Sequence, residues 1–286
     1  MINRESKISW ANTPDLEQSQ IVVVGIQDES GSHARLTGTS KAPSAIRRVS
    51  NERDVYTEHK MKCLALPTYG LGSTKVYDYG NIKKRQIPQV FEKIMSFPKI
   101  PIGIGGDHSN TTPILKEIAK KHGKISLVYF DAHPDFVSHT RNYYGSVITD
   151  SLEIIDTKSS LQIGIRSPEE EEIANLKKYG IKVITPIEVL EKGIAETSKM
   201  ITDTIKENVY ISFDMDCLDP AHAPGVSVPV SFGIYGPDAL YMVKKIVSRG
   251  VVGMDIMEVC PPRDFNDMTS HLASRLIGEV ISSCKV

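Results

Sequence analysis

The fold is decided by one stretch of sequence, Ser126-Leu127-Val128-Tyr129-Phe130-Asp131-Ala132-His133-Pro134-Asp135. Its first half is a short run of apolar, β-prone residues, which indicates a buried strand. Its second half reads Asp-x-His-x-Asp and places three potential metal ligands within five residues. In α/β proteins, the side chains that follow a buried parallel strand line the ligand crevice at the carboxyl edge of the sheet. The stretch therefore predicts a strand that delivers two carboxylates and one imidazole to such a site.

Segments with strand-like and helix-like patterns alternate along the rest of the chain. Strands are expected at residues 21–26, 62–66, 100–104, 125–130, 161–165, 181–184, 209–213 and 251–256, and residues 76–80 are expected to be a strand end or a turn. Helices are expected at 43–48, 88–96, 112–121, 168–178, within 186–206, at 237–248 and at 268–283. Such alternation predicts an α/β fold with a mostly parallel sheet and helices on both faces. No repeat or low-complexity linker interrupts it, so residues 1–286 are expected to form a single domain, with residues 1–19 as an N-terminal arm.

The composition is ordinary for a globular protein. Hydrophobic residues make up 40% of the chain, charged residues make up 24%, and the formal net charge is −1. This balance gives no reason to expect a nucleic-acid or membrane-surface partner. No apolar run approaches the roughly 20 residues of a membrane-spanning helix, and the polar N-terminus lacks the apolar core of a signal peptide. The cysteines (Cys63, Cys217, Cys260 and Cys284) are widely spaced, which indicates reduced thiols in a cytoplasmic protein.

Three other expected strands also end in potential ligands. Residues 100–104 are followed by Gly105-Gly106-Asp107-His108-Ser109, residues 209–213 by Asp214-Met215-Asp216, and residues 251–256 by Glu258. Parallel strand ends share one edge, where gathered carboxylates would repel one another unless cations neutralised them. Two imidazoles with several carboxylates suit ions such as Mn²⁺ and are too oxygen-rich for a structural zinc site. The potential ligands at these strand ends are His108, Asp131, His133, Asp135, Asp214, Asp216, Asp219 and Glu258.

Each motif also has an ordinary structural interpretation. A lone Asp-x-Asp after a strand is more often a cap or a turn than a pair of ligands. Asp107 or Ser109 is likewise suited to cap the helix that follows. Three such motifs at successive strand ends are harder to explain as coincidence, so we favour the metal site. Two ions about 4 Å apart would share carboxylates and hold a bridging hydroxide.

These motifs closely resemble, in order and spacing, the three signature motifs of the arginase–agmatinase (ureohydrolase) family. The third motif is Ser212-Phe213-Asp214-Met215-Asp216-Cys217-Leu218-Asp219-Pro220. Two further segments are similar to family segments, Ala42-Pro43-Ser44-Ala45-Ile46-Arg47 and Asp255-Ile256-Met257-Glu258-Val259-Cys260-Pro261. The resemblance extends from about residue 20 to the end. It implies the three-layer αβα arginase/deacetylase-like fold with a mostly parallel central sheet.

The resemblance also implies two Mn²⁺ per chain. One ion would bind His108, Asp131, Asp135 and Asp214, and the other Asp131, His133, Asp214 and Asp216, with Asp131 and Asp214 as bridges. The implied reaction is attack of a metal-bridging hydroxide on the guanidinium carbon of a small substrate, which releases urea and an amine. Asp135 would be catalytic by orienting the hydroxide, and Glu258 would bind the guanidinium group. The family also implies a homo-oligomer, either a trimer or a hexamer.

The chain departs from the family after the Asp-x-His-x-Asp motif. Family enzymes usually carry a histidine there, which shuttles a proton to the leaving amine. This chain has Tyr144 or Gly145 at the expected position. His139 is nearby in sequence and is the candidate proton shuttle, although an exposed loop histidine is the alternative interpretation. Loss of general acid–base help typically costs about 10²–10⁴-fold in rate.

A second departure concerns the expected border of the substrate pocket. Ala223-Pro224-Gly225 resembles the agmatinase-like branch, but Val226-Ser227-Val228-Pro229-Val230-Ser231 replaces the family's Thr-Gly-Thr-Pro. No residues stand out that would bind the amino and carboxylate groups of an amino acid, which favours agmatine, with putrescine as product. Arginase, guanidinobutyrase and formimidoylglutamase activities remain alternatives, as does a metal-binding relative that has lost catalysis.

Two other enzyme classes fit the residues less well. A deacetylase of similar fold needs a single zinc ion, whereas His108, Asp135 and Asp216 argue for two ions. A Mg²⁺-dependent phosphoryl-transfer enzyme seldom uses histidine ligands, and the chain has no phosphate-cradling Gly-x-x-x-x-Gly-Lys loop.

Overall fold

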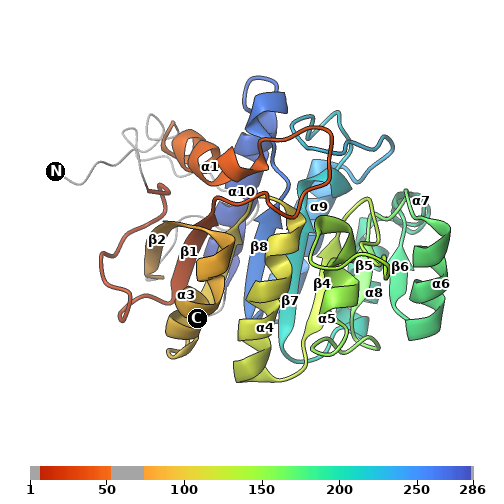
Figure 1. The fold of residues 1–286 in the computed structure, drawn as a ribbon, viewed down its shortest axis with the longest axis horizontal. Coiled ribbons are helices and arrows are strands. Elements are labelled where there is room, and N and C mark those ends of the chain that lie inside the picture. The colour runs from red at the N-terminus through yellow and green to blue at the C-terminus, as the bar shows by residue number, and fades with distance from the viewer. Residues whose placement is uncertain (1–6, 53–73, 285–286) are drawn as a thin grey trace.

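The computed structural model describes residues 7–52 and 74–284. They form one sheet of eight strands in the order β2-β1-β3-β8-β7-β4-β5-β6, and every neighbouring pair is parallel (Figure 1). The strands are β1 (Ile21–Ile26), β2 (Val76–Ile82), β3 (Ile100–Ile104), β4 (Ser126–Phe130), β5 (Leu161–Ile163), β6 (Lys182–Ile184), β7 (Val209–Asp214) and β8 (Gly253–Met257).

Helices cover both faces of this sheet (Figure 1). One face carries α1 (Ala42–Asn51), α7 (Pro186–Lys192), α8 (Ile194–Thr204), α9 (Gly236–Val247) and α10 (Met268–Ser283). The other carries α3 (Ile87–Met95), α4 (Thr111–His122), α5 (Val147–Ser151) and α6 (Glu170–Tyr179). Each face has its own hydrophobic core cluster, so the molecule has three layers. The predicted αβα fold with a parallel sheet is confirmed. No helix in the described ranges is long and apolar enough to cross a bilayer.

The opening stretch of sequence forms β4, which is buried along its whole length. Val128 and Phe130 pack in the core beneath α9 and α10, whereas Leu127 and Tyr129 pack in the core beneath α3 and α4. The Phe130 ring stacks on Phe213 of the neighbouring strand β7, with 4.9 Å between ring centroids. A parallel strand that is covered on both faces needs this continuous apolar sequence, and its last residue leads directly into the Asp-x-His-x-Asp motif.

Several elements differ in extent from the sequence prediction. The region 186–206 forms two helices, because Gly193 interrupts the helical backbone. Its φ is +76°, a value that favours glycine. Strands β5 and β6 have three residues each, shorter than expected. Strand β8 begins two residues later than predicted, at Gly253. The predicted strand at 62–66 and Cys63 lie outside the described residues.

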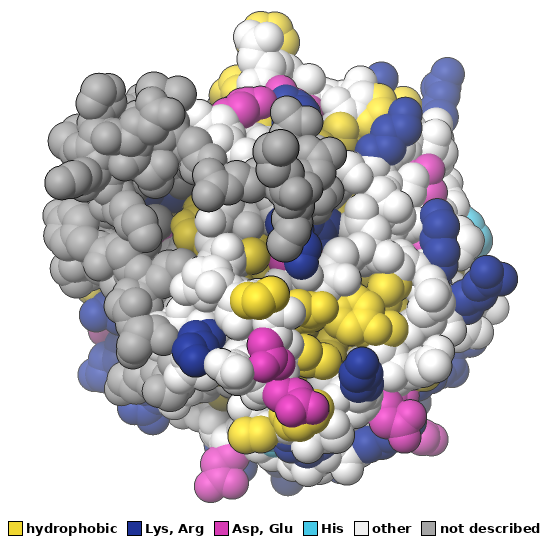
Figure 2. All heavy atoms as spheres, turned by 90° about the vertical axis from the view of Figure 1, so that its left-hand side faces the viewer, with side chains coloured by type: hydrophobic (Ala, Val, Ile, Leu, Met, Phe, Trp, Pro, Cys, Tyr) yellow, Lys and Arg dark blue, Asp and Glu magenta, His cyan; other side chains and the backbone are white. Residues whose placement is uncertain are grey.

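Residues 7–19, which were expected to belong to an N-terminal arm, pack along the edge strand β2. Ile8 is buried and its N–H donates to Asp78 Oδ2 at 2.7 Å. The Asn12 side chain joins β2 by accepting from Val76 N and donating to Thr74 O, both at 2.8 Å. Figure 2 shows this side of the molecule, where hydrophobic side chains gather among basic and acidic ones. The segment covers part of a sheet edge that would otherwise expose unpaired backbone groups.

A buried ion pair joins this edge of the sheet to α1. The Arg47 guanidinium donates to both carboxylate oxygens of Asp78 at 2.8 Å, and neither side chain is more than 2% exposed. Burial alone would raise the pKa of Asp78, but the hydrogen bonds and charge of Arg47 hold this pKa below its usual range. A carboxylate with a lowered pKa stabilises the fold above its unfolded pKa of about 4, and this stabilisation is lost as the pH falls.

Replacing Asp78 with Asn should therefore lower the free energy of unfolding at pH 7 by about 3 kcal/mol, because it leaves the buried Arg47 charge uncompensated. The difference from the native protein should shrink as the pH falls below about 4, where the carboxylate of the unfolded chain takes up a proton before the native one does. Urea denaturation at several pH values measures both effects. The exposed pair Arg48–Glu52 provides the control, since Glu52→Gln should change the stability by less than about 0.5 kcal/mol. Equal effects of the two substitutions would contradict this account.

Candidate metal centre

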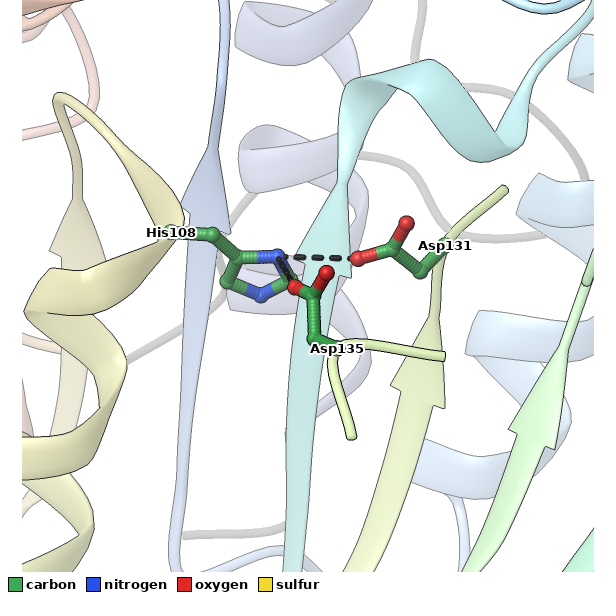
Figure 3. Close-up of side chains that lie close together, drawn as sticks. All are labelled: His108, Asp131 and Asp135. Carbon is green, nitrogen blue, oxygen red and sulfur yellow. Dashed lines mark ion pairs between the residues drawn. The ribbon is translucent and has the colours of Figure 1, made fainter. Parts of the chain in front are cut away.

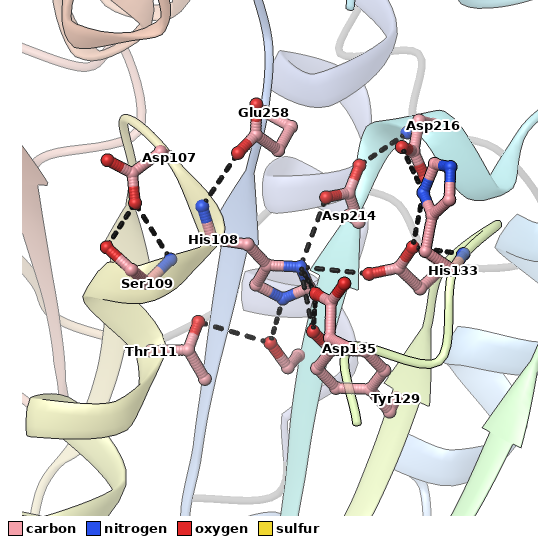
Figure 4. A network of polar contacts seen from close by, with 12 residues as sticks. Asp107, His108, Ser109, Thr111, Tyr129, His133, Asp135, Asp214, Asp216 and Glu258 are labelled. Carbon is pink, nitrogen blue, oxygen red and sulfur yellow. Dashed lines mark hydrogen bonds and ion pairs between the residues drawn. The ribbon is translucent and has the colours of Figure 1, made fainter. Parts of the chain in front are cut away.

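The ends of four neighbouring strands bring the predicted ligands together. Strands β3, β8, β7 and β4 are adjacent in the sheet, and their carboxyl ends meet at one edge. His108 follows β3, and Glu258 follows β8. Asp131, His133 and Asp135 follow β4, while Asp214 ends β7 and Asp216 lies just beyond it. Figure 4 shows these side chains converging from separate strands.

The first group of ligands surrounds one nitrogen of His108 (Figure 3). His108 Nδ1 lies 3.0 Å from Asp131 Oδ2 and 3.4 Å from Asp135 Oδ2. Asp214 Oδ2 is 3.1 Å from the same nitrogen. Donor atoms of His108, Asp131 and Asp135 all lie within 4.8 Å of one another, and all three residues are buried. This spacing is close enough for the three side chains to bind one ion.

The second group shares Asp131 with the first. His133 Nδ1 lies 3.2 Å from Asp216 Oδ2 and 3.5 Å from Asp131 Oδ1. The donor atoms of these three residues again lie within 4.8 Å of one another. The His133 side chain is 23% exposed, so this group lies nearer the surface than the first. Asp131 therefore presents one oxygen to each group, as a bridging carboxylate requires.

Short backbone turns fix the direction of these carboxylates. Asp131 Oδ1 accepts from His133 N at 2.6 Å, and Asp214 Oδ1 accepts from Asp216 N at 2.7 Å. Asp216 Oδ1 accepts from Ala132 N at 3.0 Å, which ties the loop after β7 to the loop after β4. In Asp214 and Asp216 the backbone holds Oδ1 and leaves Oδ2 directed at the cluster, whereas both oxygens of Asp131 face the cluster. The motif spacing thus sets the geometry through local hydrogen bonds.

The backbone also adopts a rare conformation at two positions of the site. Asp135 has φ +49° and Glu258 has φ +65°, in the left-handed region that side chains other than glycine seldom occupy. Such residues persist where the surrounding structure holds them, and they concentrate at functional sites. Here the turns aim both carboxylates into the same cavity, which is lined by Asp131, His133, Asp135, Asp214, Asp216 and Glu258 together with side chains from three loops.

A buried hydrogen-bond network selects the tautomer of His108. Asp255 is fully buried and accepts from Ser212 Oγ at 2.8 Å. Because the single Ser212 hydroxyl proton goes to Asp255, Ser212 Oγ must accept the 2.8 Å bond from His108 Nε2. The proton of neutral His108 therefore lies on Nε2, and the lone pair of Nδ1 faces the carboxylates. Partners of this kind orient a ligating histidine and tune its affinity for metal.

The electrostatics of the cluster indicate a need for positive charge. Burial lowers the pKa of each histidine, but the carboxylates outweigh it and raise the pKa of His108 to about 9 and that of His133 to about 12. Burial and the neighbouring carboxylates raise the pKa of Asp135 and of Asp214 well above the usual range. Each shift moves a group towards its protonated form, so protons supply the charge that a cation would otherwise supply.

The residues fit a divalent metal by two tests. Asp131 Oδ2 is buried and accepts no hydrogen bond, and it lies 3.0 Å from His108 Nδ1, so an ion bound between these two atoms would give the oxygen a partner. The donor set consists of two imidazoles and several carboxylates, without cysteine. That chemistry suits Mn²⁺ and related hard or borderline ions better than a thiolate-seeking metal.

Glu258 forms one wall of the cavity beside the metal ligands. It is buried, and its Oε1 accepts from His108 N at 2.8 Å. The other oxygen, Oε2, is buried without a hydrogen-bond partner. Burial, followed by the charge of Asp107, raises the pKa of Glu258 to about 8. A cation that entered the cavity would meet an unpaired carboxylate oxygen there.

His139 is not brought to the cluster. Its side chain is 67% exposed, and its Nδ1 pairs with Glu171 Oε2 at 2.9 Å. Glu171 also accepts from Ser138 N at 3.0 Å, so helix α6 holds this part of the loop at the surface. Tyr144 lines the cavity instead, and burial, followed by the charges of Asp135 and Glu258, raises its pKa. The sequence has Tyr144 or Gly145 at the expected shuttle position, and of these two Tyr144 lines the cavity.

Comparison with known proteins agrees with this geometry. Residues 19–282 match the model of the arginase family. The chain belongs to the arginase family. It is 31% identical over 274 residues to an agmatinase of Neisseria gonorrhoeae, which covers 91% of this chain and 85% of the relative. It is 32% identical over 265 residues to the human mitochondrial guanidino acid hydrolase, which covers 86% and 74%. The solved agmatine ureohydrolase of Thermoplasma volcanium superposes with a TM-score of 0.83 at 29% identity, which covers 97% and 94%.

Members of the arginase family are hydrolases that act on guanidino compounds, and by the names of its relatives this chain is an agmatinase-like ureohydrolase. The cluster of His and Asp side chains lies where the family's metal-binding motifs occur in the sequence. Residues that support the ligands were not identified as candidates from the sequence. Ser212 and Asp255 lay inside the family motifs, but only the fold shows that they meet His108.

Replacing Ser212 with Ala should weaken metal binding by about 10–100-fold, because His108 loses the acceptor that fixes its tautomer. Calorimetric titration of the metal-free protein with Mn²⁺ measures this change. Ser248→Ala, at the exposed end of α9, is the control and should bind Mn²⁺ as the native protein does. An unchanged Mn²⁺ affinity in Ser212→Ala would show that the network does not support the ligand.

Proposed function

We propose that the protein is a Mn²⁺-dependent ureohydrolase that cleaves a guanidino C–N bond, with agmatine as substrate and urea and putrescine as products. The observation that carries the proposal is the pair of ligand groups that share Asp131, next to the unpaired carboxylate oxygen of Glu258. The first supplies sites for two cations, and the second supplies a partner for a guanidinium group. The names of the related agmatinase and agmatine ureohydrolase support the same chemistry.

Two Mn²⁺ ions would be held by the residues that the motifs predict. His108, Asp131, Asp135 and Asp214 would hold one ion, and Asp131, His133, Asp214 and Asp216 the other. When bound, such ions acidify a water molecule and stabilise developing negative charge. The carboxylates that now gain protons from their surroundings would then be neutralised by the metals. Their unusual pKa values therefore belong to the protein without metal.

Asp135 is positioned to handle the proton of the reaction. Its Oδ2 accepts from the Tyr129 hydroxyl at 2.5 Å, whereas its Oδ1 accepts no hydrogen bond from a described residue. We propose that Asp135 Oδ1 accepts a proton and passes it to the leaving nitrogen. This route does not need His139, which is exposed and paired with Glu171.

Glu258 would orient the substrate. Its Oε1 is held by His108 N, which leaves Oε2 directed into the cavity for a charge-assisted hydrogen bond from the guanidinium group. The resulting ion pair is buried, and it fixes the plane of the group next to the metal ligands. Guanidinium is always charged at neutral pH, so its arrival also compensates the buried carboxylate.

The walls of the cavity favour a substrate without a carboxylate at its far end. Apart from the carboxylates and His133, the cavity is lined by Ser32, Ala34, Tyr144 and Val228, none of which carries a positive charge. Its volume is about 10 Å³, roughly that of one water molecule. Entry of a guanidinium group must therefore move one of these side chains. A guanidino acid is the second candidate, because the human guanidino acid hydrolase is 32% identical.

Urea release from a panel of guanidino compounds tests the proposed substrate. Agmatine should give the highest kcat/KM, ahead of arginine and 4-guanidinobutyrate, and putrescine should appear in equal amount to urea. Formimidoylglutamate, which would release formamide instead of urea, is assayed separately and should also be hydrolysed less efficiently. A preference for 4-guanidinobutyrate would select the guanidino acid activity. Failure to hydrolyse any compound, in a sample that contains two metals per chain, would indicate a relative that has lost catalysis.

The two ligand groups can be separated by substitution. His133→Ala and Asp216→Ala should each lose one of the two metals and nearly all activity, because both residues belong to the second group of ligands. Elemental analysis and urea release on the same sample measure the two losses. His139→Ala, which removes an exposed imidazole, should keep both metals and the activity. Full activity in His133→Ala would contradict a mechanism that needs two ions.

Replacing Glu258 with Gln should lower kcat/KM by about 10²-fold, because a buried pair with guanidinium loses its charge. The substitution keeps the shape of the side chain and the acceptor for His108 N, so the metal content should not change. Steady-state kinetics and metal analysis together measure this separation. Loss of metal in Glu258→Gln would show that the residue supports the ligands and would count against a role in substrate binding.

We also propose, from the family resemblance, that the protein is a cytoplasmic homo-oligomer, either a trimer or a hexamer. Analytical ultracentrifugation measures the assembly directly.

A further inference from the structure

A second and much larger cavity lies beside the metal centre. Its volume is about 700 Å³, within the range of small-molecule sites. Four basic side chains line it, and one acidic side chain, Asp28, faces them. Lys83, Lys84 and Arg85 come from the segment that leads into α3, and Lys116 comes from α4. We call this cavity the basic groove.

The positive charges of the basic groove are only partly compensated within the described residues, because Asp28 and the buried Asp107 interact with the charge of Lys84 alone. The ammonium groups of Lys83 and Lys84 donate hydrogen bonds to neutral acceptors, Gln27 O and Ser109 Oγ. Arg85 and Lys116 form neither an ion pair nor a hydrogen bond with another described side chain, and both are exposed. Asp28 accepts from backbone N–H groups and from Ser30. Four like charges that face one cavity attract a multivalent anion and gain stability from binding it.

The basic groove and the metal centre share three segments of the chain. Ser109 lines the groove, while its neighbour His108 binds in the metal centre. In the loop after β1, Ser30 lines the groove and Ser32 lines the metal cavity. Likewise, in the loop after β4, Asn142 lines the groove and Tyr144 lines the metal cavity. In each segment, therefore, one side chain lies at the groove and another lies at the metal centre. A movement of a segment in one cavity would also alter the wall of the other.

Hydrogen bonds continue from the groove to the mouth of the metal cavity. Lys84 donates to Ser109 Oγ, and Ser109 Oγ donates to Asp107 Oδ1 (Figure 4 shows the second contact). Asp107 is fully buried, and its Oδ2 accepts from Gly31 N at 2.9 Å. Gly31 O in turn accepts from Tyr144 N at 3.1 Å. An anion that drew Lys84 away from Ser109 would disturb the first link of this chain.

We propose that the basic groove binds a small multivalent anion, the chemistry shared by phosphate esters and polycarboxylates, and that the bound anion changes the mobility of the loops around the metal cavity. The groove is separate from the metal ligands, and none of its lining residues belongs to them. Its ligand would therefore act as an effector and not as a substrate. Binding is measured without turnover, so this proposal stands or falls independently of the proposed reaction.

Isothermal titration calorimetry with inorganic phosphate and, separately, with succinate tests the site on the Mn²⁺-loaded protein. Sodium chloride at the same ionic strength is the reference. At least one of the two anions should bind saturably. If only phosphate or only succinate binds, that anion identifies the preferred chemistry of the ligand. The double variant Arg85→Gln, Lys116→Gln should bind about tenfold more weakly, because two charge-assisted contacts are lost. The matched control Lys177→Gln, Lys199→Gln removes two exposed charges elsewhere and should bind normally.

Hydrogen–deuterium exchange reports on the loops in the same samples. Saturating anion should change the exchange of residues 28–34 and 142–146 in the native protein, and the double variant should not respond at the same concentration. Three results would overturn the proposal. These are the absence of saturable binding by either anion, equal binding by the double variant and the native protein, and binding that leaves the exchange of both loops unchanged.

Discussion

The structure depends on one electrostatic constraint, the burial of several carboxylates at a single edge of the sheet. Asp131, Asp135 and Asp214 lie around one nitrogen of His108, within 3.0–3.4 Å of it. Carboxylates in such a place cannot all be charged unless positive charge compensates them. The upward pKa shifts of Asp135 and Asp214, and those of the two histidines, express the same requirement. Metal ions meet it with chemistry that protons cannot provide.

The rest of the fold holds this arrangement in place. A parallel sheet whose central strands are buried aligns four strand ends, and a hydrophobic core packs against each of its faces. Buried polar groups then aim the ligands, as Ser212 and Asp255 do for His108. The left-handed turns at Asp135 and Glu258 bring the last two carboxylates into the cavity. Stability from the layers is therefore what allows like charges to stay close together.

The sequence predicted the sheet and the cluster because both depend on local patterns. Continuous apolar runs indicated the buried strands, and the Asp-x-His-x-Asp spacing indicated ligands at a strand end. An exposed loop position was one of the two interpretations for His139, but the sequence did not show its partner, Glu171, which lies 32 residues further along the chain. The break between α7 and α8 at Gly193 was likewise hidden within a helical pattern. The basic groove joins residues from distant segments and became visible only in the folded chain.

The central claim is that this edge of the sheet holds two metal ions that share Asp131. The most direct measurement is a crystal structure of the Mn²⁺-loaded protein with anomalous diffraction data collected at the manganese absorption edge. The account predicts two anomalous peaks about 3.5–4 Å apart. One should lie beside His108 and Asp135, the other beside His133 and Asp216, with an oxygen of Asp131 close to each. A single peak, or two peaks that do not share Asp131, would contradict it.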